Sequence, residues 1–319
     1  MQATARAQPN IALVKYWGKR DTPRNLPAVG SISITLDDLY TEMTVELGSA
    51  ATDRLSINGR EESVLLPRVS RCLDDVLGAG RPRADVASRG NFPVAAGLAS
   101  SASAFAALVV AASAAGGKRR GAAELAALAG RASGSAARSL YGGYVELANA
   151  GDGVELAVLR DAGDWPLRIV AAVTEAGPKA VSSGDAMEIS RTTSPFYPRW
   201  VEEQPADLDA ARAAIAARDF DALAAVAEHN CLKMHSVMWT SRPSVVYWNA
   251  ATVACLEALR RLRAAGADVF FTIDAGPQVK AVCTPGCEDD VIAALAGTPG
   301  VVAVLSSGLG PGARLLDPA

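Results

Sequence analysis

A run of small residues leading into an apolar stretch is the first segment of the chain that could do chemistry. Residues 91–103 read Asn-Phe-Pro-Val-Ala-Ala-Gly-Leu-Ala-Ser-Ser-Ala-Ser. Free backbone N–H groups at a helix start, at the positive end of the helix dipole, bind anions, and small side chains let phosphate oxygens approach the backbone. The segment fits neither GxxxxGK[ST] nor GxGxxG. It therefore predicts a phosphate cradle of another kind, with a serine-capped core helix as the alternative.

A lysine at the end of an apolar run is the second such feature. If residues 11–15 form a strand, Lys15 shares a face with Ile11 and Leu13. A lysine carried inward needs a partner or an anionic ligand, because an isolated buried ammonium is costly. An edge strand with solvated lysines is the alternative, and it would account for Lys19 more readily than for Lys15.

An arginine and an aspartate each lie in a segment rich in small residues. Residues 133–144 read Ser-Gly-Ser-Ala-Ala-Arg-Ser-Leu-Tyr-Gly-Gly-Tyr, and Arg138 offers a planar fork for a carboxylate or phosphate. Residues 271–277 read Phe-Thr-Ile-Asp-Ala-Gly-Pro, so Asp274 ends an apolar strand and can accept a proton from a substrate hydroxyl. The structural alternatives are a surface arginine in a Gly-rich connection and an aspartate that caps a turn.

The elements that must position these residues mix strands and helices. Period-2 alternation with β-branched residues predicts strands at 31–36 and 41–47, and Asn58-Gly59 predicts a hairpin turn. No regular βαβ repeat follows, so the sequence predicts an α+β fold. Further strands are expected near 85–88, 154–159, 167–174, 269–273, 279–283 and 301–305, and helices near 64–78, 100–115, 122–132, 207–217, 219–229 and 248–264.

Length and charge limit the organisation and the partners. The 319 residues suffice for one large domain or two ordinary ones, and the texture changes after Gly177-Pro178. We therefore expect an N-terminal domain at 1–177 and a C-terminal domain at 178–319. With 31 Lys and Arg against 34 Asp and Glu, the net charge of −3 gives no electrostatic footprint for nucleic acid or an anionic membrane.

Three features bear on the cellular compartment. Residues 90–117 are uncharged and long enough for a membrane helix, but they begin with glycine and proline and are built mainly from Ala, which favours a buried helix. The first ten residues lack the apolar core of a signal peptide. Five cysteines and only two histidines favour thiols in a reducing cytosol over a metal site. We expect a cytoplasmic protein.

Four motifs, in this order and spacing, resemble the mevalonate diphosphate decarboxylase family of the GHMP (galactokinase, homoserine kinase, mevalonate kinase, phosphomevalonate kinase) superfamily. They are NIALVKYWGK, FPVAAGLASSASAFAAL, SGSAARSLYGG and TIDAGPQVK. The resemblance implies a ribosomal-S5-like N-terminal domain that binds ATP, a ferredoxin-like C-terminal domain and an active site in the cleft between them. It also implies Mg²⁺, a homodimer, and conversion of (R)-5-diphosphomevalonate and ATP to isopentenyl diphosphate, ADP, phosphate and CO2 in the mevalonate pathway.

The resemblance also implies roles for single residues. Asp274 would be the catalytic base beside the tertiary 3-hydroxyl, Lys15 would keep it ionised, and Arg138 would hold the substrate carboxylate. The residues expected at the substrate are Asn10, Tyr16, Lys19, Ser133, Gly134, Ser135, Ser183 and Met187, and those at the nucleotide are Ser88, Ala96, Gly97, Leu98, Ala99, Ser100 and Ser101.

The chain departs from the family pattern at three places. Gly184 stands where many relatives carry an arginine near the diphosphate, residues 28–30 replace an Asn-containing run, and Gln278 replaces an asparagine. The first departure leaves open a decarboxylase of 5-phosphomevalonate or a mevalonate 3-kinase-like relative. A non-catalytic nucleotide- or metabolite-binding sensor of the same fold is a further alternative, against which the three charged motif residues argue.

Overall fold

The computed structural model describes residues 1–48, 51–92, 100–177 and 179–316, and the statements below concern these residues. The helices are α1 (Leu66–Leu77), α2 (Ser100–Ala115), α3 (Ala122–Ala132), α4 (Ser183–Thr193), α5 (Tyr197–Ala217), α6 (Phe220–Trp239), α7 (Ala250–Ala264) and α8 (Glu288–Ala296), with a 3-10 turn η1 (Arg138–Leu140) among the shorter elements. The strands are β1 (Gln2–Ala7), β2 (Asn10–Val14), β3 (Lys19–Asp21), β4 (Leu26–Pro27), β5 (Ser31–Thr35), β6 (Thr41–Leu47), β7 (Arg54–Ile57), β8 (Arg60–Glu61), β9 (Ala84–Gly90), β10 (Tyr144–Ala150), β11 (Gly153–Arg160), β12 (Arg168–Val173), β13 (Val269–Ile273), β14 (Val279–Cys283), β15 (Ala303–Gly308) and β16 (Arg314–Leu316).

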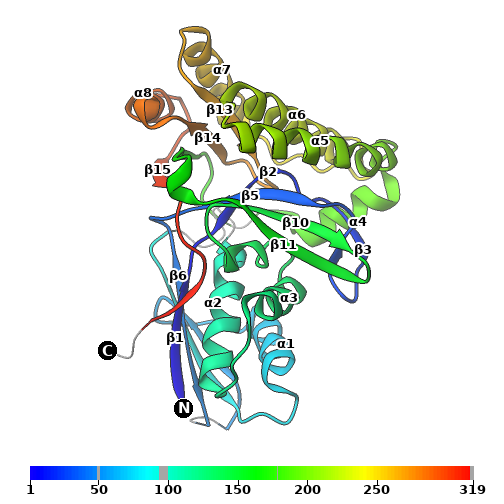
Figure 1. The fold of residues 1–319 in the computed structure, drawn as a ribbon, viewed down its shortest axis with the longest axis vertical. Helices are drawn as coiled ribbons and strands as arrows, with labels where there is room; N and C mark the ends of the chain where they lie inside the picture. Colours follow the sequence, from blue (N-terminus) through cyan, green and yellow to red (C-terminus); the bar gives the residue numbers. More distant parts are fainter. Residues whose placement is uncertain (49–50, 93–99, 178, 317–319) are drawn as a thin grey trace.

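The N-terminal part is a sheet covered on one face by helices (Figure 1). Its strand order is β16-β1-β6-β9-β7-β8. Helix α2 packs on β1 and β6 and also meets α1 and α3, so most of its side chains are buried. A helix that is apolar all round has no solvated face to offer and is stable only in such a central position. This confirms the buried helix that the sequence predicts for the uncharged stretch.

A second sheet joins the two halves of the chain. Its order is β11-β10-β5-β2, and Ile11 and Ile32 on the last two strands are fully buried. They belong to one apolar cluster with Leu223 of α6, Phe270 of β13 and Val282 of β14. Because this cluster draws on both halves, burial of its apolar surface holds the end of β2 against the β13–β14 sheet.

The C-terminal part is an antiparallel sheet in the order β13-β14-β12-β15. Helices α7 and α8 pack on it, and α6 contacts β13. Val269–Ile273 and Val279–Cys283 are buried at every position, since each face of the strands meets an apolar layer.

The chain then returns to the N-terminal sheet. After β15, Leu309 bridges Leu36, Gly310 N–H donates to the Thr35 carbonyl, and β16 pairs with β1. A Cβ at Gly310 or Gly312 would overlap neighbouring backbone, so glycine permits this close passage. We call residues 309–313 the C-terminal crossing.

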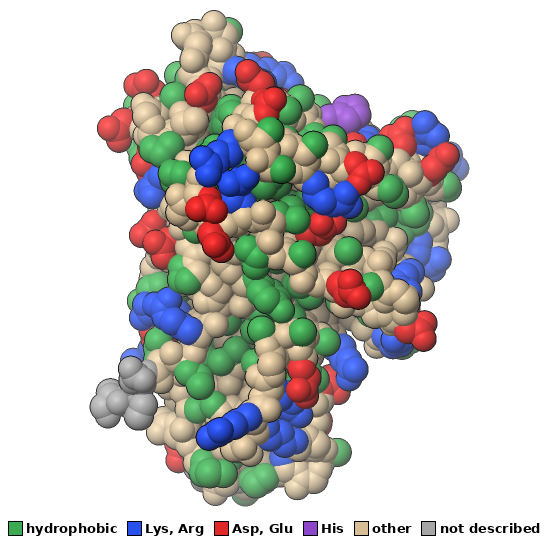
Figure 2. Space-filling view, viewed as in Figure 1, with side chains coloured by type: hydrophobic (Ala, Val, Ile, Leu, Met, Phe, Trp, Pro, Cys, Tyr) green, Lys and Arg blue, Asp and Glu red, His purple; other side chains and the backbone are tan. Residues whose placement is uncertain are grey.

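The strands and helices predicted from periodicity are confirmed, with differences in length. Helices α5 and α6 extend beyond the predicted 207–217 and 219–229, because each continues along the same buried surface past Pro205 and past His229. Helices α4 and α8 and strands β1, β3, β4, β10 and β16 escaped prediction. Within the described ranges, no helix is long and apolar enough to cross a membrane. Basic and acidic side chains are interspersed on the face shown in Figure 2.

Candidate active site

A buried lysine and an aspartate from opposite halves of the chain form an ion pair. Lys15 follows β2 and is 1% exposed, and its Nζ donates to Asp274 Oδ1 at 2.7 Å and to the Ala12 carbonyl at 2.8 Å. The strand ends at Val14, one residue earlier than predicted. The prediction that Lys15 points inward and needs a partner is confirmed.

Two buried amide side chains hold the backbone of Lys15. Asn230 Oδ1 of α6 accepts from the Lys15 N–H at 2.7 Å, and Gln204 Nε2 of α5 donates to its carbonyl at 2.8 Å. The two amides are themselves joined, since Asn230 Nδ2 donates to Gln204 Oε1 at 2.9 Å. Both backbone groups of Lys15 are therefore satisfied from C-terminal helices, which fixes the point from which its side chain reaches Asp274.

The backbone before Asp274 is held by side chains of α6, whereas the Asp274 carboxylate is partly exposed. The preceding Ile273 carbonyl accepts from Cys231 Sγ at 3.4 Å and lies 3.2 Å from His235 Nε2. The Asp274 side chain keeps 27% of its surface exposed, so it can meet a ligand. Burial by itself would raise the pKa of Asp274, but attraction to Lys15 and Lys280 outweighs it, and the pKa lies well below its ordinary value.

Lys280 is a further residue of this site. It is the last residue of the motif TIDAGPQVK, and no role was predicted for it from the sequence. It lies in β14, is 0% exposed, and its Nζ is 3.3 Å from Asp274 Oδ2. Burial lowers the pKa of Lys280. The signal that could have found it is a lysine inside the apolar run Val279–Cys283, the same argument that singled out Lys15.

Arg138 lies in η1, fully buried and surrounded by neutral groups. Its Nε donates to Ser33 Oγ at 2.9 Å, Nη1 donates to Ser31 Oγ, and Nη2 donates to Asn10 Oδ1 at 3.2 Å. No carboxylate of the described residues forms an ion pair with it. Burial lowers the pKa of Arg138 to about 10, so it stays charged at neutral pH. Asn10 in turn donates to Ser139 Oγ at 2.8 Å and to the Ser135 carbonyl at 2.9 Å.

Tyr16 lies against the Arg138 segment, and Lys19 is a partly buried lysine of the neighbouring strand β3. A Cβ at Gly134 would overlap the Tyr16 hydroxyl, so the glycine lets the ring lie against this turn. Burial raises the pKa of Tyr16 to about 12, against the attraction of Arg138. Lys19 lies in β3, and burial followed by repulsion from Arg68 lowers its pKa. Attraction to Glu188 and Asp185 opposes this lowering, so Lys19 has charges of both signs near it.

Serine hydroxyls connect the Arg138 segment to the start of α2. Ser133, which is 5% exposed, donates to Ser101 Oγ at 3.4 Å and lies 3.4 Å from Ser135 Oγ. Ser100 and Ser101 begin α2 and are partly exposed. Ala96, Gly97, Leu98 and Ala99, predicted to wrap the nucleotide phosphates, lie outside the described residues.

The start of α4 reaches the turn that carries Asp274. Lys179 Nζ donates to Ser183 Oγ at 2.6 Å and to the Ala275 carbonyl at 2.7 Å. Burial, and then repulsion from Lys280, lowers the pKa of Lys179 to about 8. Met187 of α4 packs on the cluster that contains Trp17.

Two residues singled out from the sequence lie away from this group. Ser88 is in β9, paired with Met43, and within the described residues its side chain has no hydrogen bond to the other predicted positions. Gln278 Oε1 accepts from the Thr174 N–H at 2.6 Å, and its Nε2 donates to the Glu175 carbonyl at 2.7 Å. Gln278 thus ties the turn after Asp274 to the end of β12, which gives this departure from the family pattern a structural reason.

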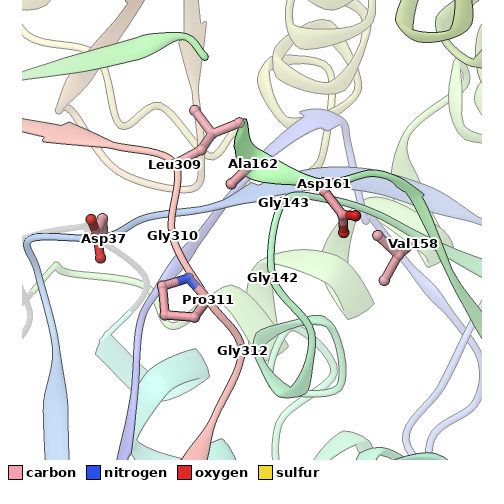
Figure 3. A pocket seen from close by; sticks show the side chains of 10 residues that line it. All are labelled: Asp37, Gly142, Gly143, Val158, Asp161, Ala162, Leu309, Gly310, Pro311 and Gly312. Carbon is pink, nitrogen blue, oxygen red and sulfur yellow. The ribbon is translucent and has the colours of Figure 1, made fainter. Parts of the chain in front are cut away.

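A surface hollow lies elsewhere, at the C-terminal crossing (Figure 3). It has a volume of about 440 Å³. Its lining residues are Asp37, Gly142, Gly143, Val158, Asp161, Ala162, Leu309, Gly310, Pro311 and Gly312. None of the residues predicted for the substrate or nucleotide lines this hollow, so it is separate from the candidate active site.

Comparison with known proteins supplies the family. The sequence model described as the diphosphomevalonate decarboxylase-like N-terminal domain matches residues 7–156, and that of the mevalonate 5-diphosphate decarboxylase C-terminal domain matches residues 169–297. The chain belongs to the diphosphomevalonate decarboxylase family. A relative from Candida albicans, named diphosphomevalonate decarboxylase, is 34% identical, and the alignment covers 97% of this chain and 96% of the relative.

Solved structures of the diphosphomevalonate decarboxylase family share the fold. Mevalonate diphosphate decarboxylase from Staphylococcus aureus matches with a TM-score of 0.92 at 33% identity, over 99% of this chain and 98% of that one. The protein designated MDDEF, in complex with MVAPP, AMPPCP and magnesium, also has a TM-score of 0.92 and 33% identity, over 99% of both chains. The family resemblance and the α+β fold of the GHMP-kinase type are confirmed.

Proposed function

We propose that this chain is an ATP-dependent diphosphomevalonate decarboxylase. It converts (R)-5-diphosphomevalonate and ATP to isopentenyl diphosphate, ADP, phosphate and CO2, as a step of isoprenoid synthesis. The observation that carries the proposal is the ionised Asp274, paired with Lys15 and near Arg138, whose hydrogen bonds to side chains in the described ranges go to neutral groups. A substrate with a carboxylate beside a tertiary alcohol supplies the partner for each.

The reaction follows from these positions. Asp274 accepts a hydrogen bond from the 3-hydroxyl and takes its proton as the oxygen attacks the γ-phosphorus of ATP. Phosphorylation turns a poor leaving group into a good one. When phosphate then leaves with the C3–O electron pair, the electrons of the bond to the carboxylate form the new C=C bond and CO2 departs. Arg138 holds that carboxylate in line by its fork, and Lys15 offsets the charge that develops on phosphate.

ATP and Mg²⁺ fit the residues present. Ser101 at the start of α2 is partly exposed and lies 3.4 Å from Ser133, which joins the nucleotide side to the substrate side. The described ranges hold no cluster of three or more His, Cys, Asp or Glu side chains. Mg²⁺ commonly uses substrate phosphates and water rather than a protein cage, and it would neutralise phosphate charge. The hydroxyls of Ser100 and Ser101 are the neutral groups that could orient it.

The remaining expectations belong to the same proposal. Asn10, Tyr16, Lys19 and Ser135 line the substrate, with Ser133, Gly134, Ser183 and Met187 completing its site. Ser88, Ser100 and Ser101 are proposed to contact the nucleotide, and the same expectation for residues 96–99 concerns residues outside the described ranges. The enzyme works as a homodimer in the cytoplasm, with domains at 1–177 and 178–319. Sedimentation analysis of the purified chain tests the dimer, and limited proteolysis near residue 178 tests the boundary.

The decisive assay follows ADP release and trapped ¹⁴CO2 from carboxyl-labelled (R)-5-diphosphomevalonate. We expect one CO2 and one phosphate for each ADP. Accumulation of a 3-phosphorylated product without CO2 would make the chain a kinase instead. ATP binding without turnover on any mevalonate derivative would make it a sensor.

A second candidate substrate is 5-phosphomevalonate. Gly184 is exposed, and a Cβ there would have only Ser182 Oγ within 4 Å, so no arginine reaches toward the terminal phosphate from this position. Parallel measurement of kcat/KM on the mono- and diphosphorylated substrates decides between them, and a higher value for the monophosphate would replace the first assignment.

A further inference from the structure

Lys280, the second lysine at Asp274, lies at a position where burial of its charge is destabilising. Lys280 is 0% exposed and stands opposite Thr272 of β13 and Ala171 of β12 in the C-terminal sheet. Its neighbour on the same face, Val282, belongs to the apolar cluster that joins the two halves. A buried ammonium is destabilising unless it is well paired. A lysine at this position therefore calls for a reason beyond packing.

The two lysines hold different oxygens of Asp274 and come from different parts of the chain. Lys15 Nζ donates to Oδ1 at 2.7 Å, and Lys280 Nζ is 3.3 Å from Oδ2. Lys280 lies in β14 and Asp274 directly follows the neighbouring strand β13, so their contact does not depend on how the two halves of the chain sit. The Lys15 contact crosses between the halves, and Lys15 is also the ammonium that meets the phosphate oxygens in the proposed reaction.

The other titratable groups around Asp274 do not replace either lysine. Arg138 and Lys179 act on it only through longer-range attraction. His235 of α6 is neutral, since burial lowers its pKa to about 3, and burial raises the pKa of the Cys231 thiol. Among the described residues, Lys15 and Lys280 are therefore the cations in direct contact with the Asp274 carboxylate.

We propose that Lys280 is the positioning residue that keeps Asp274 ionised and aligned when Lys15 turns to the substrate. Lys280 fixes Oδ2 inside its own sheet, which leaves Oδ1 to accept the 3-hydroxyl proton. Lys15 serves Asp274 in the free enzyme and the developing phosphate charge in the ternary complex. This inference rests on the proposed function. It gives Lys15 and Lys280 different roles, although both contact Asp274.

The test is Lys280→Met, which keeps the length of the side chain and removes its charge. In the free variant Lys15 still pairs with Asp274, whereas in the complex Asp274 loses both cations and its burial raises its pKa. The acid limb of the kcat profile should therefore move up by about two pH units, and that of kcat/KM should move less. At pH 7 Asp274 is ionised in both enzymes, so its poorer alignment should lower kcat about tenfold, with KM within twofold of the wild type, and the loss should grow as pH falls.

Val282→Ala is the matched control, because it removes packing on the same face of β14 without touching a charge. It should lower the melting temperature and leave both pH profiles unchanged. A Lys280→Met enzyme whose rate falls equally at every pH, or whose profiles match those of the wild type, overturns the inference. Failure of the wild-type chain to release CO2 from the substrate would instead refute the proposed function, so the two failures are distinguishable.

Discussion

The site has two sides that treat buried charge in opposite ways. On the Asp274 side, two lysines surround one carboxylate, and each charge has a partner within the protein. On the Arg138 side, the guanidinium meets Ser31, Ser33 and Asn10, which offer dipoles but no charge. The difference shows which charged group is already balanced by the protein before a ligand binds. Asp274 is held ready in its working ionisation state, whereas Arg138 carries a charge that the ligand must balance.

Removing the carboxylate should produce the largest effect. In Asp274→Asn the proton acceptor is lost and two buried ammonium groups lose their partner, so we expect kcat to fall about 10⁴-fold. The melting temperature should fall as well, because unpaired buried charges are costly. Steady-state assay, calorimetric ATP titration and thermal denaturation measure the three quantities, and ATP affinity should be unchanged. Turnover close to that of the wild type would make Asp274 a structural residue.

Replacing the fork on the other side should cost less activity and less stability. Arg138→Lys keeps the charge but loses the planar geometry, so kcat/KM should fall about 10²-fold and KM should rise. Arg138→Lys leaves no carboxylate of the described residues unpaired, but Ser31, Ser33 and Asn10 lose hydrogen bonds, so the melting temperature should fall less than that of the Asp274 variant. Arg160→Lys is the control, since Arg160 donates to carbonyls of Ile215 and Ala216 outside the site. A melting temperature as low as that of Asp274→Asn would contradict the comparison.

His235 gives the Asp274 side a pH dependence in stability. Its folded pKa of about 3 lies below the ordinary 6.5, so the unfolded chain binds more protons and stability is lost as pH falls below 6.5. Between pH 7 and pH 5 the loss should be about 2 kcal/mol, measured by chemical denaturation. His235→Phe should remove most of this slope. A slope that persists in the variant would place its origin in another group.

The smallest effect concerns the phosphate end of the substrate. Gly184 is exposed with room around it, so Gly184→Arg should fold normally and add a cation near the expected diphosphate. We expect KM for the diphosphorylated substrate to fall about threefold, as one partly solvated ion pair allows. Gly163→Arg, also exposed with open space at its Cβ, is the control. An equal gain in both variants would show a general effect of charge.

Much of this arrangement could be predicted from the sequence, because its signals are local. Lys15 stands out as a charge at the end of an apolar run, and the start of α2 follows from serines before a helical apolar stretch. The strand positions follow from period-2 alternation, which the pleat imposes. The hydrogen bond between Asn10 and Arg138 is a tertiary contact, but both residues lie in motifs of the same family.

The parts that escaped prediction depend on distant contacts. Gln204 and Asn230 resemble ordinary polar residues of amphipathic helices, and only the folded chain shows that they hold the backbone of Lys15. Lys280 is a lysine within an apolar run, as Lys15 is, but every position of its strand is buried, so only the folded chain shows that it meets Asp274. Helix α4 is short and mostly polar, and packing rather than periodicity sustains it.

The C-terminal crossing has a consequence for how the enzyme is made. Ala313 N–H donates to the Ser139 carbonyl within η1, and Gly312 packs against Leu140, so the turn that carries Arg138 is supported by residues that are synthesised after Lys15, Asp274 and α2. While the ribosome still holds this segment, the nascent chain can already fold the α2 sheet and pair Lys15 with Asp274. Its arginine turn gains this support only when the segment emerges. Catalytic competence should therefore arise only after residues 309–313 have emerged, later than the pairing of Lys15 with Asp274.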